Sequence, residues 1–182
     1  KENFKNIVLG TGHLSEQISE YVSTSRTHQI QISKENKPLG TGGALKFALP
    51  KLQSEYILVM NGDSFIDYEI SKLVHFHYTK DADSTILATE TNNSSDYGTI
   101  LLNEDGLVLD FIEKKQSEKK QVVNAGVYVI RKSSIEKMEN CFSLEKDFFP
   151  ALCKKRKLYG LKTKENFFDI GTKKRYNEFS LI

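Results

Sequence analysis

Hydrophobic residues recur with two different periods along the first half of the chain. Short apolar or alternating runs are typical of strands, and they occupy residues 6–10, 28–33, 56–60 and 84–89. Stretches with apolar residues three or four positions apart predict helices, and they cover residues 14–22, 42–49 and 69–78. The first of these helices carries an apolar stripe at Leu14, Ile18, Tyr21 and Val22. Strands that alternate with helices in this way predict a sheet covered by helices.

The pattern changes in the second half of the chain. Two alternating runs, residues 99–102 and 107–113, flank the turn Glu104-Asp105-Gly106 and predict a hairpin. A long apolar run predicts a strand over residues 122–130. The other predicted elements are helical stretches at 134–139 and 143–153, a strand near 157–162 and a closing helix from Lys173. We therefore expect one domain whose sheet is parallel toward the front of the chain and mixed toward the back.

Composition limits the classes of protein to which the chain can belong. Its 182 residues suffice for one domain with a sizeable core, and contents of 38% hydrophobic and 27% charged residues are typical of globular proteins. The net charge is +2 and no basic block is interleaved with aromatic residues, so we expect no nucleic-acid partner. No apolar run is long enough to span a membrane. Cys141 and Cys153 have neither a metal-binding nor a disulfide-framework spacing, which favours reduced thiols and the cytoplasm.

The apolar run Tyr56–Met60 has the length of a buried parallel strand, and it ends at Asn61-Gly62-Asp63. Ligands of open α/β sheets bind beyond the carboxyl ends of the strands. Asp63 is therefore placed to hold a hard cation, and the missing side chain at Gly62 would let a phosphate approach the backbone. A plain turn is the alternative, because Asn-Gly is a common turn dipeptide.

Two glycine-containing segments are further candidates for ligand contact. Residues 38–44 (PLGTGGA) run into a predicted helix, and the first N–H groups of a helix can face an anion or a polar ligand edge. This segment is neither G-x-G-x-x-G nor a P-loop, so its spacing alone is a weak indication of a nucleotide. Asn124-Ala125-Gly126 interrupts an apolar strand. Because Asn and Gly are unfavourable in strands, we expect a ligand or another backbone to approach closely there.

Charged residues define two more candidate sites. Asp96-Tyr97-Gly98 is followed across the hairpin by Glu113-Lys114, for which an exposed ion pair is the commoner explanation. Asp169 lies among apolar residues in Phe168-Asp169-Ile170-Gly171-Thr172, where a buried acid is costly unless it is paired or binds a metal. Capping of the final helix is the alternative, because Asp and Thr are both good N-cap residues.

In their order and spacing these segments resemble the sugar-1-phosphate nucleotidyltransferases, and the resemblance covers essentially the whole chain. It is greatest with the short bacterial guanylyltransferases that act on heptose or mannose 1-phosphate. The segments that carry it are GTGH at 10–13, PLGTGGA at 38–44, NGD at 61–63, DYG at 96–98, EK at 113–114, NAGVY at 124–128 and DIGT at 169–172. The resemblance implies a Rossmann-like three-layer α/β/α (GT-A-like) nucleotidyltransferase domain with a mixed central sheet over residues 1–182. The implied reaction is in-line attack of a sugar-1-phosphate oxygen on the nucleotide α-phosphorus, with pyrophosphate leaving.

The resemblance also implies a role for each matching residue. Asp63 and Asp169 would hold Mg²⁺ against the nucleotide phosphates, since Mg²⁺ prefers one or two carboxylates with phosphate oxygens and waters. Lys114 would neutralise the sugar phosphate, and Glu113 would accept hydrogen bonds from sugar hydroxyls. The walls of the sugar pocket would be Tyr97, Gly98, Asn124 and Gly126. The nucleotide would be bound by Glu35, Leu39, Gly40, Thr41, Asn61 and Gly62.

The implied partners are a nucleoside triphosphate, with GTP favoured, and a sugar 1-phosphate, while a homo-oligomer stays open. Glu35 stands where the family places its base-reading residue, and a carboxylate can accept both adjacent donors of guanine. An exposed loop acid is the alternative for Glu35. A uridylyl-, cytidylyl- or thymidylyltransferase and a non-catalytic nucleotide-binding protein are the other functions. A glycosyltransferase of similar fold would normally want an Asp-x-Asp pair, whereas this strand end offers Asp63 and Asp67.

One part of the family pattern has no counterpart in these residues. The family opens with a strand and a G-G-x-G-T-R-L loop that holds the triphosphate, and Lys1 stands where its second strand would begin. The absent strand would be the middle strand of the sheet, and its neighbours would be left unpaired without it. We therefore expect a βα unit of about 30 residues or more before Lys1. Activity would be in doubt for a protein without it.

Overall fold

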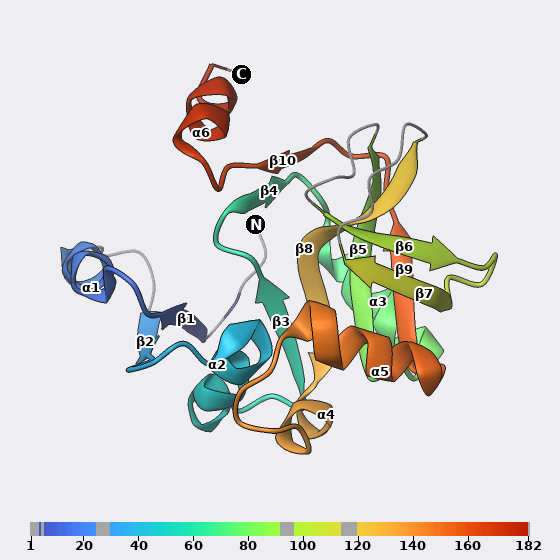
Figure 1. Cartoon of the computed structure of the whole chain (residues 1–182), viewed down its shortest axis with the longest axis horizontal. Helices are drawn as coiled ribbons and strands as arrows, with labels where there is room; N and C mark the ends of the chain where they lie inside the picture. The colour runs from blue at the N-terminus through green and yellow to red at the C-terminus, as the bar shows by residue number, and fades with distance from the viewer. Residues whose placement is uncertain (1–3, 5, 25–29, 92–96, 114–119, 182) are drawn as a thin grey trace.

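The computed structural model describes residues 4, 6–24, 30–91, 97–113 and 120–181, and its centre is a mixed sheet of six strands. These strands are β3 (Tyr56–Met60), β5 (Ser84–Thr91), β6 (Gly98–Leu102), β7 (Val108–Glu113), β8 (Gln121–Arg131) and β9 (Leu158–Lys162). Five of them lie in the order β7-β6-β8-β5-β9, and β3 pairs with β8 outside this path (Figure 1). The β5–β9 pair is parallel and the other pairs of this sheet are antiparallel. The predicted mixed α/β fold is confirmed.

Helices cover both faces of this sheet, because successive residues of each strand face opposite hydrophobic clusters. Ile86 of β5 belongs to one cluster with Tyr128 of β8, and the next residue, Leu87, belongs to the other with Leu73. The cover on the Leu87 side is α3 (Ile70–Lys80). The cover on the Ile86 side is α2 (Gly40–Ala48), the 3-10 turn η1 (Leu49–Lys51), α4 (Lys132–Glu136), the π-helical turn η2 (Leu144–Phe148) and α5 (Phe149–Lys154).

The long strand β8 changes its neighbour along one edge. Val123 of β8 pairs with Thr99 at the start of β6, whereas Val127 pairs with Met60 at the end of β3. Residues 124–126 lie between these two partners, and the register with β5 shifts at the same place, as in a β-bulge. The carboxyl end of β3 and the amino end of β6 therefore diverge at Asn124-Ala125-Gly126. The stretch of β8 between its two partners therefore lies next to the residues that follow β3.

The first two strands do not join the large sheet. β1 (Ile7–Thr11) and β2 (Ile30–Lys34) pair in parallel as a sheet of their own. The predicted bounds of β3 are confirmed, but its predicted parallel pairing is wrong for the described residues, in which β3 pairs only with β8 and antiparallel to it. Of its residues only Ile57 is fully buried, while Met60 is 53% exposed. The expected further strand and its βα unit stay a prediction.

The helix α1 (Ser15–Thr24) forms where the apolar spacing predicts it, beside β1 and β2 (Figure 1). Its apolar stripe is nevertheless exposed to solvent, with Leu14 at 52% and Tyr21 at 75%. The reason is its position, because neither hydrophobic cluster of the large sheet includes a residue of α1. Helical periodicity here predicted the element and not its surroundings.

A second small sheet was not predicted from the sequence. β4 (Ser64–Ile66) pairs antiparallel with β10 (Phe167–Asp169), close to the C-terminal helix α6 (Lys173–Phe179) (Figure 1). Each of these strands has three residues, which is too few for a periodic pattern to be visible. The pairing brings together segments that lie about 100 residues apart in the sequence. None of the described helices is long and apolar enough to cross a membrane.

Candidate active site

A polar cleft of about 190 Å³ opens where β8 changes its neighbour. Residues from four predicted segments meet in it, although they are far apart in the sequence. Those that line the cleft are Asn61, Asp63, Tyr97, Gly98, Asn124, Gly126 and Asp169. The structure therefore brings together the predicted sugar-pocket residues and the two predicted metal-binding carboxylates.

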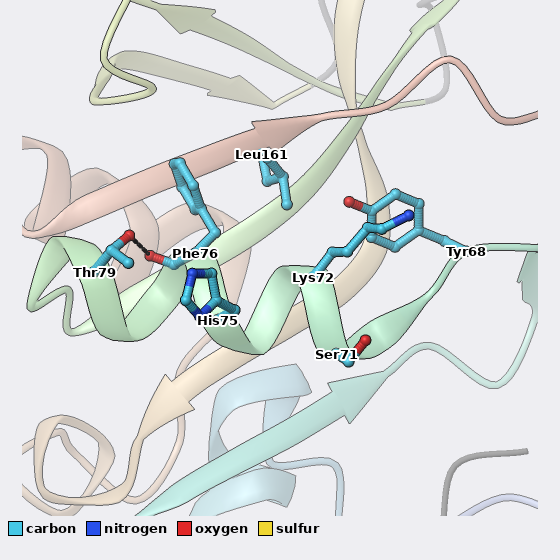
Figure 2. A pocket seen from close by; sticks show the side chains of 7 residues that line it. All are labelled: Tyr68, Ser71, Lys72, His75, Phe76, Thr79 and Leu161. Carbon is cyan, nitrogen blue, oxygen red and sulfur yellow. Dashed lines mark hydrogen bonds between the residues drawn. The ribbon is translucent and has the colours of Figure 1, made fainter.

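A larger hollow of about 560 Å³ lies on the outer side of α3, away from these residues. Figure 2 shows that its side chains come mainly from α3, including Lys72, His75 and Phe76, with Leu161 contributed by β9. Its lining is largely apolar, and none of the predicted site residues belongs to it. Size alone would favour this hollow, but convergent polar groups are what an active site needs. The smaller cleft is therefore the candidate site.

Gly126 has a backbone conformation that few other residues adopt, with φ at +72°. Its carbonyl oxygen accepts a hydrogen bond of 2.8 Å from the N–H of Asn61. A Cβ atom at this position would lie 2.9 Å from Oγ of Ser64. The glycine therefore lets the turn after β3 approach the bulge of β8, which confirms the predicted close approach of another backbone.

Asn124 stabilises the same bulge from inside. Its Oδ1 accepts a hydrogen bond of 2.8 Å from the N–H of Gly126, and its Nδ2 donates one of 2.7 Å to the hydroxyl of Tyr128. Tyr128 is fully buried, and desolvation raises the pKa of its phenol, so the group stays neutral. A polar residue in this strand is thus satisfied within the protein while it also borders the cleft.

Asp63 and Asp169 converge although they come from distant segments. Asp169 is the register partner of Ser64 in the β4–β10 sheet, and the carbonyl oxygen of Asp63 accepts a 2.8 Å hydrogen bond from the N–H of Ile170. A Cβ atom built on Gly171 would lie 2.9 Å from Oδ2 of Asp63 and 3.2 Å from Oδ1 of Asp169. Both carboxylates therefore border the space above the α-carbon of Gly171.

The carboxylate of Asp169 is paired, and it does not cap the final helix. Its Oδ1 accepts the N–H of Gly171 at 2.8 Å, and its Oδ2 accepts Nη1 of Arg175 at 2.7 Å. The N-cap of α6 is Thr172, whose hydroxyl accepts the N–H of Arg175 at 3.2 Å. The alternative explanation of Asp169 as a cap is therefore wrong, and Arg175 is a site neighbour that sequence reasoning missed.

The donor set of this pair fits a magnesium ion that is also bound by substrate. Among the described residues no group of three or more His, Cys, Asp or Glu side chains is placed around one point for a metal. Mg²⁺ keeps several waters and commonly uses one or two carboxylates together with substrate phosphates. Asp63 and Asp169 supply that number of carboxylates, so any ion between them would need oxygen atoms from the nucleotide and from water.

The glycine-rich first turn of α2 is packed against the chain near Phe142. The N–H groups of Gly42 and Gly43 both donate to the carbonyl oxygen of Phe142, each at 3.1 Å. Gly40 has φ at +77°, and a Cβ atom on Gly42 would lie 2.1 Å from the ring of Phe142. The expectation that the first N–H groups of this helix face a ligand is therefore wrong for Gly42 and Gly43, because close packing already uses them.

Asn61 lines the cleft, and the other predicted nucleotide-binding residues lie outside its lining. Glu35 is half-buried, and its Oε2 accepts the N–H of Leu39 at 3.2 Å. Gly40 and Gly62 are exposed. Thr41 does not line the cleft, but its hydroxyl donates a hydrogen bond to Glu145, which does. Their roles toward a nucleotide stay predictions.

The Glu113-Lys114 segment is only partly described. The backbone of Glu113 ends β7 and pairs with Gly98, which lines the cleft, so the strand leads directly to the site. Lys114 and Asp96 lie outside the described residues. The predicted contact of Lys114 with a sugar phosphate therefore stays a prediction.

The whole-chain pattern decides the family. A family model described as "Nucleotidyl transferase" matches residues 1–181. The chain belongs to the nucleotidyl transferase family. Its members include proteins whose sequences resemble this one over nearly all its length.

Two relatives of this nucleotidyl transferase chain differ in how much of their length it matches. Mannose-1-phosphate guanylyltransferase catalytic subunit beta of Drosophila pseudoobscura pseudoobscura is 32% identical over 178 residues, which cover 94% of this chain and 48% of that protein. D-glycero-alpha-D-manno-heptose 1-phosphate guanylyltransferase of Aneurinibacillus thermoaerophilus is 32% identical over 182 residues, covering 98% and 78%. The chain thus spans about half the length of the mannose-1-phosphate relatives.

A solved structure of the family has the same fold. HddC from Yersinia pseudotuberculosis, complexed with GMP-PN, superimposes with a TM-score of 0.81 at 28% sequence identity. The match covers 96% of this chain and 76% of HddC. The arrangement of sheet and helices described above is therefore that of a solved member of the family.

Sequence reasoning missed three residues that line the cleft of this nucleotidyl transferase chain, namely Ser64, Glu145 and Phe167. Phe167 contacts Tyr97 with ring centroids 5.3 Å apart in an edge-to-face arrangement. The signal for Phe167 was its place directly before the Asp169 segment. Glu145 gave no signal, because an acid in the first turn of a helical segment is ordinary.

Proposed function

We propose that this protein transfers a nucleotidyl group, GMP from GTP, to a sugar 1-phosphate of the mannose or heptose type. The products are a nucleoside diphosphate sugar and pyrophosphate. The observation that carries the proposal is the convergence of Asp63 and Asp169 beside the wall formed by Tyr97, Gly98 and Asn124. Two carboxylates next to a small polar cleft fit a phosphate-bound cation on one side and a hydroxylated sugar on the other.

The choice of mannose or heptose 1-phosphate and of GTP is supported by the relatives. Both relatives compared above are guanylyltransferases, and HddC was solved with GMP-PN. In this chain Glu35 is the residue proposed to read guanine. One of its carboxylate oxygens is held by the N–H of Leu39, which fixes the direction of the group. A fixed carboxylate can accept two adjacent donors, and only guanine offers them.

The chemistry needs positioning and charge neutralisation more than covalent catalysis. An oxygen of the sugar 1-phosphate attacks the α-phosphorus, a new P–O bond forms, and the bond from that phosphorus to the pyrophosphate oxygen breaks. When bound by Asp63 and Asp169, Mg²⁺ would neutralise the phosphate charge that develops in this step. The remaining tasks belong to the protein. Lys114 balances the charge of the sugar phosphate, and Glu113, Asn124 and Gly126 orient the sugar.

We further propose that residues 1–182 act as one nucleotidyltransferase domain. Both hydrophobic clusters share the strands β5 and β8, so the two faces of the sheet cannot separate without breaking one core. The cleft lies at the end of this shared core, and its residues come from both the early and the late parts of the chain.

The test is an assay of the purified protein with GTP, MgCl₂ and mannose 1-phosphate or heptose 1-phosphate, with pyrophosphate release and the nucleotide sugar as readouts. The Asp63→Asn variant keeps the shape of the exposed side chain and should lose about a hundredfold or more in turnover with an unchanged melting temperature. A wild-type protein that binds GTP without releasing pyrophosphate would favour the non-catalytic alternative. Full activity of Asp63→Asn would remove Asp63 from the mechanism.

A further inference from the structure

Glu145 stands on a segment whose backbone is fixed from several directions. Ser143 caps the π-helical turn η2, and its hydroxyl accepts the N–H groups of Glu145 at 3.2 Å and of Lys146 at 3.1 Å. The carboxylate of Asp147 accepts the N–H of Ser143 at 2.8 Å in return. Leu144 is buried beside this cap. Turns of the π type are frequent at functional sites.

Leu39 and the glycine-rich first turn of α2 hold the same turn from outside. The N–H of Phe142 donates to the carbonyl oxygen of Leu39 at 3.0 Å, and the carbonyl oxygen of Phe142 accepts from Gly42 and Gly43. The N–H of Leu144 donates to the hydroxyl of Thr41 at 2.9 Å. The segment that contains Glu145 is therefore packed against the start of α2. A Cβ atom at Gly40, Gly42 or Gly43 would clash with residues 140–142 and push the two segments apart.

Within the described part of the chain, one oxygen of the Glu145 carboxylate accepts the hydrogen bonds that orient the side chain. Its Oε2 accepts hydrogen bonds from the hydroxyl of Thr41 at 2.8 Å and from the hydroxyl of Ser143 at 3.0 Å. Neither hydroxyl bonds Oε1, while the residue itself lines the cleft beside Asn124 and Gly126. The carboxylate is thus oriented by the protein and still borders the space in which a ligand would lie.

The chemistry of a carboxylate restricts that ligand group. An ionised carboxylate can only accept hydrogen bonds, and it repels phosphate oxygens. Glu145 does not join Asp63 and Asp169 around one metal position in the described part of the chain. What remains on a sugar 1-phosphate is a hydroxyl group, which is a hydrogen-bond donor.

We propose that Glu145 accepts a hydrogen bond from a ring or side-chain hydroxyl of the sugar and so helps to determine which sugar 1-phosphate is bound. Thr41 and Ser143 are positioning residues that orient its carboxylate. The inference rests on the proposed function, since it names a contact within that substrate site. It also assigns to Thr41 an effect on the sugar, although the resemblance places Thr41 among the nucleotide-binding residues.

The first experiment measures binding, so that it does not depend on turnover. Titration calorimetry with mannose 1-phosphate and with GTP compares the wild type, Glu145→Gln and Asp147→Asn. Asp147 is a matched control, because it is an acid of the same turn that contacts Ser143 and does not line the cleft. Glu145→Gln should weaken binding of mannose 1-phosphate by about tenfold or more, because a hydrogen bond to a charged acceptor is lost. Binding of GTP by Glu145→Gln, and both affinities of Asp147→Asn, should change less than about threefold.

The second experiment identifies the hydroxyl with the monodeoxy analogues of mannose 1-phosphate. For one analogue the wild type and Glu145→Gln should bind equally, because the donor of the lost hydrogen bond is absent from both complexes. For the other analogues the difference between the two proteins should persist. If the affinities of the wild type and Glu145→Gln differ by the same factor for all analogues, Glu145 acts on the fold and the proposal is overturned.

The third experiment tests the positioning role of Thr41. Thr41→Val removes the hydroxyl that fixes Oε2 and should weaken sugar 1-phosphate binding more than GTP binding, while Thr41→Ser should recover most of the loss. Equal weakening for both ligands would place Thr41 with the nucleotide only and would overturn its positioning role.

If mannose 1-phosphate is bound but not turned over, the proposed function fails and the Glu145 contact stands. If neither heptose nor mannose 1-phosphate is bound by the wild type, the contact is wrong.

Discussion

The carboxylates of Asp63 and Asp169 both border the space above the α-carbon of Gly171, which has no side chain to fill it. A Cβ atom on Gly171 would lie 2.9 Å from Oδ2 of Asp63 and 3.2 Å from Oδ1 of Asp169. Contacts this short force the carboxylate ends to move, which they can do cheaply because they are small side-chain ends. The glycine of the Asp-Ile-Gly-Thr segment is therefore part of the site geometry.

Gly171→Ala is expected to displace both carboxylates and lower turnover by about tenfold or more, while the fold is kept. Gly171 is exposed, so the cost in unfolding free energy should stay within about 1 kcal/mol. Gly10→Ala is the matched control, since a Cβ atom on Gly10 meets nothing within 4 Å. The measurements are steady-state kinetics and thermal melting. Unchanged kinetics of Gly171→Ala would contradict the role assigned to this gap.

Lys114→Met is expected to impair use of the sugar phosphate selectively. Methionine keeps the apolar part of the side chain and removes the charge that would balance the phosphate. GTP binding should stay nearly normal, while kcat/KM for the sugar 1-phosphate should fall by about tenfold or more. The control is Lys120→Met, because Lys120 pairs with Glu90 on the surface at 2.8 Å. Equal losses for both substrates would argue against a contact with the sugar phosphate.

Glu35→Gln is expected to narrow the preference for GTP over UTP. The carboxylate would accept two donors of guanine, and a side-chain amide can accept at only one of its two ends. Leaving one buried donor unsatisfied costs about 1–3 kcal/mol, so the ratio of kcat/KM for GTP and UTP should fall by about tenfold or more. A wild-type enzyme that uses UTP or CTP as readily as GTP would refute the guanine assignment.

The stability of the domain is expected to depend on the titration of His77, which packs between α3 and the sheet. Burial, the largest cause, and the nearby charge of Arg131 together lower the pKa of His77 from 6.5 to about 4, against the opposing effects of Asp83 and Asp81. The ring is 1% exposed, and its Nδ1 lies 2.8 Å from the hydroxyl of Thr85.

The unfolded chain therefore binds one more proton than the folded domain between about pH 6.5 and about pH 4. The stabilisation by neutral His77 is complete above about pH 6.5 and is lost as the pH falls toward about 4. The slope of the unfolding free energy against pH approaches about 1.4 kcal/mol per pH unit at most. Chemical denaturation at several pH values measures it, and His77→Gln should have a shallower slope across this range. Equal slopes in both proteins would show that other groups dominate.

Much of the fold was predictable because periodic sequence patterns report local structure. The apolar run Tyr56–Met60 has the same bounds as β3, and the helical spacing before Thr24 corresponds to α1. The mixed order of helices and strands predicted a covered sheet, which the two hydrophobic clusters confirm. Burial was predicted less well, since the stripe at Leu14 and Tyr21 is exposed: periodicity does not say which surface a helix will meet.

The sequence by itself determined which residues carry the candidate chemistry. Asp63 was indicated by its place beyond the end of a strand, and Asn124 and Asp169 because they are unusual or costly in apolar segments. Only the tertiary structure decided how they meet. The β4–β10 pairing joins strands of three residues across most of the chain, and such short strands leave no periodic signal. The same holds for Glu145, whose orientation comes from Thr41 in a distant helix. The glycines in the first turn of α2 showed the opposite case: the sequence suggested a ligand there, and the close approach of Phe142 explains Gly40 and Gly42. Contacts between residues far apart in sequence depend on the packed chain as a whole, and no local pattern encodes them.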